Sequence, residues 1–221
     1  VELVSQILAK MCKVDHISDI YDNAADNEAL NTLYERISAK IYGQDNAVRS
    51  VVEAVQMSRA GLLDDNKPVA SLLFVGPTGV GKTEVARVLA QELGLGLVRF
   101  DMSEYAEKHT VAKLIGSPAG YVGYEDGGLL TDAIRRTPNC VLLLDEIEKA
   151  HSDIYNLLLQ VMDYASLSDN RGQKADFRHV VLIMTSNAGA QHSGKSSVGF
   201  TGSTNRGGAM MKAVKATFKP E

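Results

Sequence analysis

Short apolar runs alternate along the chain with stretches in which apolar residues recur every three or four positions. Runs of the first kind, bounded by Gly, Pro and polar residues, predict strands at 71–75, 97–102, 141–144 and 180–185. The first, third and fourth of these runs are apolar enough to be buried strands. Stretches of the second kind predict helices at 46–60, 85–93, 104–115, 129–136 and 154–161. Strands that alternate with helices are typical of an α/β protein with a parallel sheet.

The two ends of the chain have a different character. Residues 1–40 are helical in tendency, with a polar, acidic interruption at 15–26. Residues 188–208 are rich in Gly, Ser and Asn, which predicts a long loop, and a further helix begins near Ala209. Because the chain starts at Val1 rather than Met and stops inside this helix, we expect it to be a fragment of a longer protein.

A phosphate-binding sequence follows the first predicted strand. Residues 76–83 read GPTGVGKT and fit G-x-x-x-x-G-K-[ST] without a mismatch. Glycines let successive backbone N–H groups point at an anion, and the following helix would place its N-terminus against the phosphates. The candidate nucleotide-binding residues here are Pro77, Thr78, Gly79, Val80, Gly81, Lys82 and Thr83. The alternative is a chance match in an ordinary turn, and the strand before it and the helix after it argue against that.

A pair of acids follows the third predicted strand directly. Asp145 lies where a carboxylate can hold Mg²⁺ together with the Thr83 hydroxyl, at the carboxyl end of a strand in the same sheet. Glu146 can orient and deprotonate an attacking water. The alternative is a solvated strand end, but a buried strand that ends in two carboxylates needs partners for those charges.

Two further features bear on the nucleotide. No Asn-Lys-x-Asp guanine-specificity motif is present, which favours adenine as the base. Asn187 follows the predicted strand at 180–185 and could hydrogen-bond a γ-phosphate or position the water. By itself, an Asn after a strand is more often a turn residue.

Composition excludes several classes of protein. The 221 residues are 45% hydrophobic and 23% charged, as in a globular domain, and the net charge of −4 gives no basic field for nucleic acid. No apolar run approaches the roughly 18 residues that span a bilayer, and we expect no membrane partner. Cys12 and Cys140 form no C-x-x-C pair, which favours a reducing compartment, and we expect a cytoplasmic protein.

The motifs together resemble one family closely. GPTGVGKT, LLLDEIEKAH, the Thr185-Ser186-Asn187 strand end and GYVG are similar to AAA+ unfoldases of the Clp type. The resemblance runs from about Ile41 to Glu221. Three further segments resemble the second ATPase module of a two-ring Clp protein: 101–105, 109–131 and 158–178.

This resemblance implies a fold and a division of the chain. The fold would be an α/β P-loop NTPase with three layers around a parallel sheet, the large subdomain of an AAA+ module. Residues 1–40 would form a helical entry segment from a preceding module, and residues 41–221 the large ATPase subdomain. The last core strand, an arginine finger and a small helical subdomain of the family would lie outside the chain.

The resemblance also implies ATP and Mg²⁺ as cofactors and assigns roles. Lys82 binds phosphate, Thr83 and Asp145 hold Mg²⁺, and Glu146 activates water. Asn187 becomes the sensor of the γ-phosphate, and Ile41 and Tyr42 contact adenine.

A second group of implied roles concerns protein partners. Tyr121 and Val122, within Gly120–Gly123, would form the pore loop that grips a polypeptide substrate at the centre of a homo-hexamer. An aromatic ring on a glycine-flanked loop can pack against many side chains, although a packed loop aromatic is the alternative for Tyr121.

The tripeptide Val198-Gly199-Phe200 resembles the one with which some Clp members dock onto the ClpP peptidase. It could instead pack onto its own domain. The segment before Ile41 also lacks the Trp-Thr-Gly-Ile-Pro signature common in ClpB and ClpC, which points to ClpA-like proteins. A ClpB-type disaggregase, which needs no peptidase, remains the alternative. A scaffold that binds ATP without hydrolysis is a third reading, but it would need neither Glu146 nor Asn187.

Overall fold

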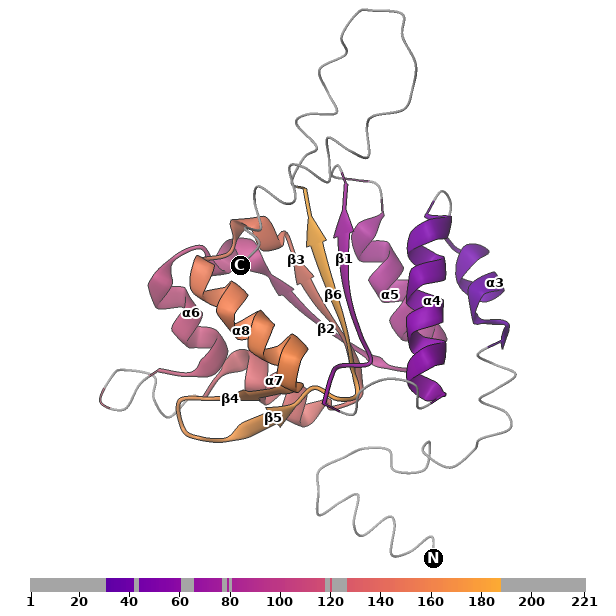
Figure 1. Ribbon diagram of the computed structural model, residues 1–221. Helices are drawn as coiled ribbons and strands as arrows, with labels where there is room; N and C mark the ends of the chain where they lie inside the picture. The colour runs from indigo at the N-terminus through magenta and orange to yellow at the C-terminus, as the bar shows by residue number, and fades with distance from the viewer. Residues whose placement is uncertain are drawn as a thin grey trace, which may run out of the picture.

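The computed structural model describes residues 31–41, 44–60, 66–76, 79, 81–117, 120 and 127–187. Its strands are β1 Ala70–Val75, β2 Gly96–Asp101, β3 Cys140–Asp145, β4 Ser166–Ser168, β5 Lys174–Asp176 and β6 Val180–Ser186 (Figure 1). Its α-helices are α3 Leu33–Ser38, α4 Asp45–Arg59, α5 Lys82–Glu92, α6 Lys108–Ile115, α7 Leu129–Arg136 and α8 Ser152–Tyr164. Two short 3₁₀ helices, η2 Met102–Tyr105 and η4 Ile147–Lys149, follow β2 and β3.

The main sheet has four parallel strands in the order β1-β6-β3-β2. The strand β6, the last in sequence among the described residues, therefore lies between β1 and β3. Its register aligns Val75 with Ser186, while β2 and β3 align Asp101 with Asp145. All four carboxyl ends consequently meet at one edge of the sheet, at the top of Figure 1.

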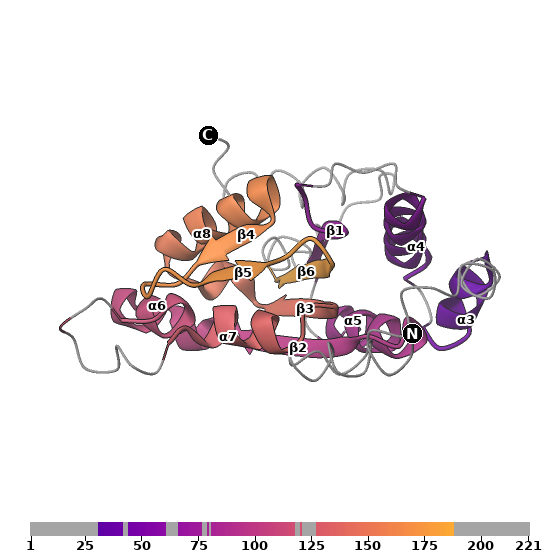
Figure 2. The same cartoon turned by 90° about the horizontal axis from the view of Figure 1, so that it is seen from below.

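Helices cover both faces of this sheet, because successive side chains of its central strands point to opposite sides. Val141 and Leu143 of β3 pack with α3, α4 and α5 in one apolar cluster. Leu142 and Leu144 pack with α6, α7 and α8 in the other. Figures 1 and 2 show the two groups of helices on opposite sides of the strands. The expected three-layer α/β fold with a parallel sheet is thus confirmed.

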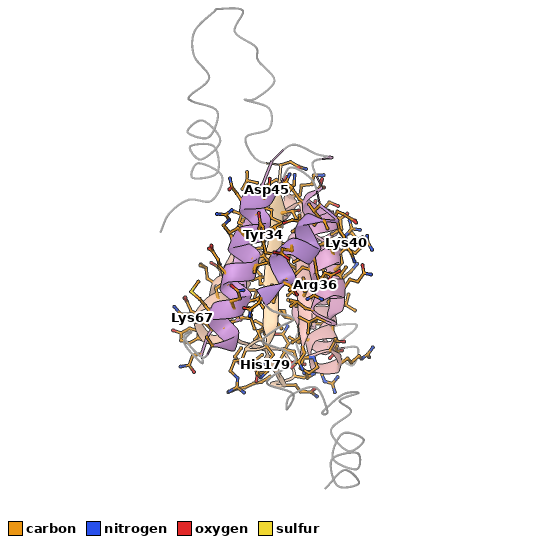
Figure 3. The ribbon with its side chains drawn as sticks, turned by 90° about the vertical axis from the view of Figure 1, so that its right-hand side faces the viewer. Tyr34, Arg36, Lys40, Asp45, Lys67 and His179 are labelled. Atoms are coloured by element: carbon orange, nitrogen blue, oxygen red, sulfur yellow. The ribbon has the colours of Figure 1, made fainter. Side chains whose placement is uncertain are left out.

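The helix α3 is attached to the domain by charge as well as by apolar contact. Leu33 and Ile37 are buried against α4 and α5. Arg36 and Lys40 both form ion pairs with Glu92 at the end of α5. Figure 3 shows Tyr34, Arg36 and Lys40 on this side of the molecule, with Asp45 at the start of α4.

The opposite end of the same view carries Lys67 and His179, which precede β1 and β6 (Figure 3). This is the amino edge of the sheet. The strands run away from it toward the edge at which the candidate site lies.

Three details differ from the sequence prediction. The helix expected at 104–115 is divided: the Asp101 side chain accepts the Ser103 N–H and begins η2, and extended backbone at Glu107 separates η2 from α6. The strand β1, expected to be buried, has only Ala70 and Phe74 buried, since it lies at the edge of the sheet in the described part of the chain. The hairpin of β4 and β5 was not predicted, because its strands have only three residues each.

Candidate active site

Five side chains or backbone groups named from the sequence meet at the carboxyl edge of the sheet. Lys82 and Thr83 begin α5, Asp145 ends β3, Glu146 follows it, and Asn187 follows β6. We call these five residues the carboxyl-edge cluster. Their proximity depends on the insertion of β6 between β1 and β3.

The N-terminus of α5 is suited to an anion. Its N-cap, Gly81, has φ of 91°, and Gly79 in the preceding loop has φ of 85°, conformations that side chains other than glycine seldom adopt. A Cβ at either position would meet no described atom within 4 Å. The N-cap glycine supplies no side-chain cap, and the helix dipole favours negative charge at this end of α5.

Lys82 is held inside the cluster. Its Nζ donates to the Gly76 carbonyl at 2.5 Å and to Asn187 Oδ1 at 2.7 Å. Partial burial lowers the pKa of Lys82, and the carboxylates of Glu148, Asp145 and Glu146 oppose that shift. A cation partly withdrawn from water and surrounded by acids is placed to receive phosphate oxygens.

The buried Asp145 carboxylate accepts from three elements. Thr83 Oγ1 donates to Oδ2 at 3.2 Å, and Arg99 of β2 donates to the same oxygen at 2.8 Å. The Thr185 hydroxyl on β6 donates to Oδ1. These donors provide the partners that a buried charge requires.

Glu146 has an unusual backbone. Its φ of 57° is in the left-handed region, which only one other non-glycine residue of the described chain, Ala165, also adopts. The Glu146 N–H donates to Thr185 Oγ1 at 3.1 Å, and its Oε1 accepts from Asn187 Nδ2 at 3.0 Å. Lys149 pairs with its other oxygen. Strain of this kind, of order 1–3 kcal/mol, tends to be retained where a side chain needs a particular direction.

This arrangement fits both groups that the sequence implies. Thr83 and Asp145 place a hydroxyl and a carboxylate side by side, and Mg²⁺ prefers such oxygen ligands together with phosphate oxygens. The cradle at Gly79 and Gly81 leaves room for the phosphates themselves.

Some predicted site residues lie away from the carboxyl-edge cluster, and others lie outside the described part of the chain. Ile41 is 6% exposed and belongs to the apolar cluster with α3, α4 and α5. A pocket of about 450 Å³ lies between the start of α4 and β1 and reaches Lys82. The predicted site residues outside the described part of the chain are Tyr42, Pro77, Thr78, Val80, Tyr121, Val122, Val198, Gly199 and Phe200.

Sequence reasoning missed three residues that touch the cluster: Arg99, Glu148 and Lys149. Arg99 is the one charged residue within the apolar stretch Leu97–Phe100, a signal that could have marked it. Glu148 and Lys149 follow the acid pair closely, but nothing in their spacing says that η4 turns them back toward Asn187 and Glu146.

Comparison with known proteins identifies the family to which the chain belongs. Residues 67–221 match the family model described as AAA domain (Cdc48 subfamily). The chain belongs to this AAA family. Within it, the chain is homologous to the second ATPase module of the Clp/Hsp100 proteins, as the following relatives show.

Curated relatives from both branches of the Clp proteins resemble the chain. It is 50% identical over 216 residues to a ClpA homolog protein of Fuscovulum blasticum, covering 98% of this chain and 27% of that protein. It is 51% identical over 199 residues to the chaperone protein ClpB of Propionibacterium freudenreichii, covering 89% and 23%. It is 46% identical over 209 residues to the Clp protease ATP-binding subunit ClpC of Staphylococcus epidermidis, covering 90% and 26%.

A solved structure shares the AAA fold. A closed-state cryo-electron microscopy reconstruction of Hsp104 with ATPyS and FITC casein superposes with a TM-score of 0.80 and 39% identity, over 89% of this chain and 34% of that one. The chain is thus an AAA ATPase domain of the Clp chaperone type, and it spans about a quarter of the length of these curated relatives. In the described part of the chain, no helix combines the length and apolar character needed to cross a membrane.

Proposed function

We propose that the carboxyl-edge cluster binds ATP with Mg²⁺ and hydrolyses it. The observation that carries this proposal is the hydrogen-bonded connection from Lys82 through Asn187 to Glu146, beside the pair formed by Thr83 and Asp145. A phosphate-binding lysine, a metal-binding pair and a carboxylate base are thereby within reach of one bound phosphate chain. A protein that only binds nucleotide would need no such base.

Each residue of the cluster then has a distinct task. Lys82 and the N-terminus of α5 bind the β- and γ-phosphates, and Thr83 and Asp145 hold Mg²⁺. Magnesium, when bound, supplies positive charge to the phosphate oxygens. Glu146 accepts a proton from the attacking water, and Asn187 orients the terminal phosphate or that water. Ile41 and Tyr42 closely precede Gln44, which lines the pocket between α4 and β1, and we assign them to the adenine.

Replacing the base tests the assignment. Glu146→Gln in the full-length protein that carries this chain should leave ATP binding intact and lower kcat by at least about a hundredfold, because an amide cannot accept the proton. Nucleotide retained after gel filtration and phosphate release measure the two properties. Glu53→Gln, an exposed position on α4, is the matched control. Turnover that survived in Glu146→Gln would contradict the role of Glu146.

The process that ATP hydrolysis drives is proposed from the resemblance to the Clp family. We assign residues 41–221 to the large ATPase subdomain, 1–40 to an entry segment, and the assembly to a hexamer that unfolds and threads polypeptides. Tyr121 and Val122 would contact the substrate. Gly116 and Gly127, with φ of 89° and 71°, flank the segment that contains them, and such values permit a sharp change of chain direction at these two residues.

Delivery of substrates to a ClpP-like peptidase is the finer proposal. Its support is the resemblance of Val198-Gly199-Phe200 to a docking tripeptide and the similarity to a ClpA homolog and a ClpC subunit. Similarity to ClpB and Hsp104 favours the second candidate, a disaggregase. Val198→Ser with Phe200→Ser in the full-length protein should abolish peptidase-dependent degradation of an unfolded substrate and spare ATP hydrolysis. Unchanged degradation would exclude docking through this tripeptide. The disaggregase would be favoured if the parent protein itself supported no peptidase-dependent degradation.

A further inference from the structure

The backbone of Asn187 lies just beyond the hydrogen-bonded ladder of the sheet. Pairing of β6 with β3 ends at Met184, and pairing with β1 ends at Ser186, whose carbonyl accepts from Gly76. At the next residue, the backbone N–H is bound by a side chain instead of by a neighbouring strand. The Asn187 N–H donates to Glu148 Oε1 at 3.0 Å.

Glu148 is itself held in place by a short, well-anchored turn. It is the middle residue of η4, directly after Glu146 and the buried Ile147. The Tyr155 hydroxyl donates to the Ile147 carbonyl at 2.9 Å, and the Lys149 N–H donates to the Glu146 carbonyl at 2.9 Å. The contact between η4 and β6 therefore joins the turn after β3 to the end of the neighbouring strand.

This placement leaves one carboxylate oxygen without a hydrogen bond among the described residues. Glu148 Oε2 is inaccessible to water and has no hydrogen-bond partner among the described residues. A buried oxygen of this kind costs free energy, so its retention requires an explanation. The position provides two interactions: the hydrogen bond from the Asn187 N–H to Oε1, and the attraction between the carboxylate and the Lys82 cation.

The side chain of Asn187 shows what that bond is for. Its Oδ1 accepts from Lys82 and its Nδ2 donates to Glu146, so the amide joins the phosphate-binding lysine to the proposed base. We propose that Glu148 is a positioning residue for ATP hydrolysis: by accepting the Asn187 N–H, it holds this amide between Lys82 and Glu146. The inference rests on the proposed function of Asn187.

Four variants of the full-length protein test it. Asn187→Ala and Glu148→Ala should each lower kcat roughly tenfold, with KM changed less than about twofold, since the bond orients the reacting groups rather than the nucleotide. Glu148→Gln should restore most of the lost rate, because its amide oxygen can still accept the N–H. The double variant Glu148→Ala with Asn187→Ala should be no more than about twofold slower than Asn187→Ala alone, because without the amide side chain Glu148 has no group left to position.

A purely structural role would not produce this pattern. Binding of a fluorescent ADP analogue and the thermal midpoint report whether each variant keeps its site and its fold, and Glu53→Ala on the exposed face of α4 is the control. Losses that multiply in the double variant, or a Glu148→Gln rate as low as that of Glu148→Ala, would overturn the inference.

The test also separates this inference from the function on which it depends. A slow Asn187→Ala with a fully active Glu148→Ala overturns the positioning role alone. A fully active Asn187→Ala removes the proposed role of Asn187 and the inference with it.

Discussion

At the residue scale, the Asp145 carboxylate connects three elements before any ligand is considered. Thr83 reaches it from α5, Arg99 from β2 and Thr185 from β6. Arg99 donates to Oδ2, which is also the Asp145 oxygen nearer the Thr83 hydroxyl. A cation therefore already neutralises the carboxylate, and Mg²⁺ must share Asp145 with it or displace it.

This competition predicts a measurable change in the magnesium requirement. Arg99→Gln should lower the Mg²⁺ concentration for half-maximal binding of a fluorescent ADP analogue by about two- to fivefold, the effect of removing one partly exposed ion pair of up to about 1 kcal/mol. Arg178→Gln, which removes the exposed pair with Asp176, is the matched control. An unchanged or raised requirement would mean that Arg99 supports the metal site instead of competing with it.

At the element scale, the β4–β5 hairpin connects the turn after α6 to the rest of the domain. The buried Asp169 accepts the N–H groups of Arg171 and Gln173 at 2.9 and 2.8 Å, and it pairs with Arg135 of α7. The adjacent Asn170 donates its N–H to the Ile115 carbonyl at 2.8 Å, at the end of α6. The two three-residue strands are thus stabilised by the hydrogen bonds that Asp169 and Asn170 form in the turn between them.

Loss of the Asp169 charge should weaken this hairpin. Asp169→Asn leaves a donor where three donors converge, and we expect a loss of about 1–3 kcal/mol in the free energy of unfolding. A decrease of roughly 2–4 °C in the thermal midpoint per kcal/mol would follow for a domain of this size. Asp163→Asn, exposed on α8, is the control and should change the midpoint little.

The same residue gives the hairpin a pH dependence with a defined sign. Burial alone would raise the pKa of Asp169, but its hydrogen bonds and Arg135 lower it below the ordinary value of 3.8. Its stabilising contribution is therefore present above that pH and is lost as the pH falls below it. Between pH 6 and pH 3, the free energy of unfolding should fall more steeply in the parent than in Asp169→Asn. Equal slopes, measured by chemical denaturation, would contradict this.

At the scale of the whole molecule, the strand order β1-β6-β3-β2 determines where chemistry can occur. It brings the ends of β1, β3 and β6 together, and the cluster occupies the crevice outside those ends, as is usual for ligand sites in open α/β sheets. The cluster contains a lysine, a base and metal ligands. The arginine finger that the family resemblance implies is not among the residues assigned to it.

We therefore expect the 221-residue chain by itself to hydrolyse ATP very slowly. The absence of an arginine finger lowers turnover by about 10³–10⁵-fold in related phosphoryl-transfer sites. Phosphate release by the purified chain, compared with the full-length protein at equal module concentration, measures the difference. Comparable rates would show that the carboxyl-edge cluster is sufficient for hydrolysis.

Much of the fold was predictable because its signals are local. The helix at 129–136 and the strand at 180–185 agree with α7 and β6 to within one residue, since each carries its own apolar periodicity. The break between η2 and α6 was not predictable from periodicity, because it depends on the cap that Asp101 forms and on extended backbone at Glu107. The β4–β5 hairpin depends on Asp169, and one partner of Asp169, Arg135, is distant in sequence.

For the site, the phosphate loop and the acid pair could be predicted from the sequence, because both are contiguous motifs next to recognisable strands. Only the folded sheet brings Asn187 between Lys82 and Glu146, with Arg99 and Glu148 beside them. The reason is that these contacts depend on which strands pair. The position of β6 between β1 and β3 depends on the packing of the whole sheet, and no local sequence pattern indicates it.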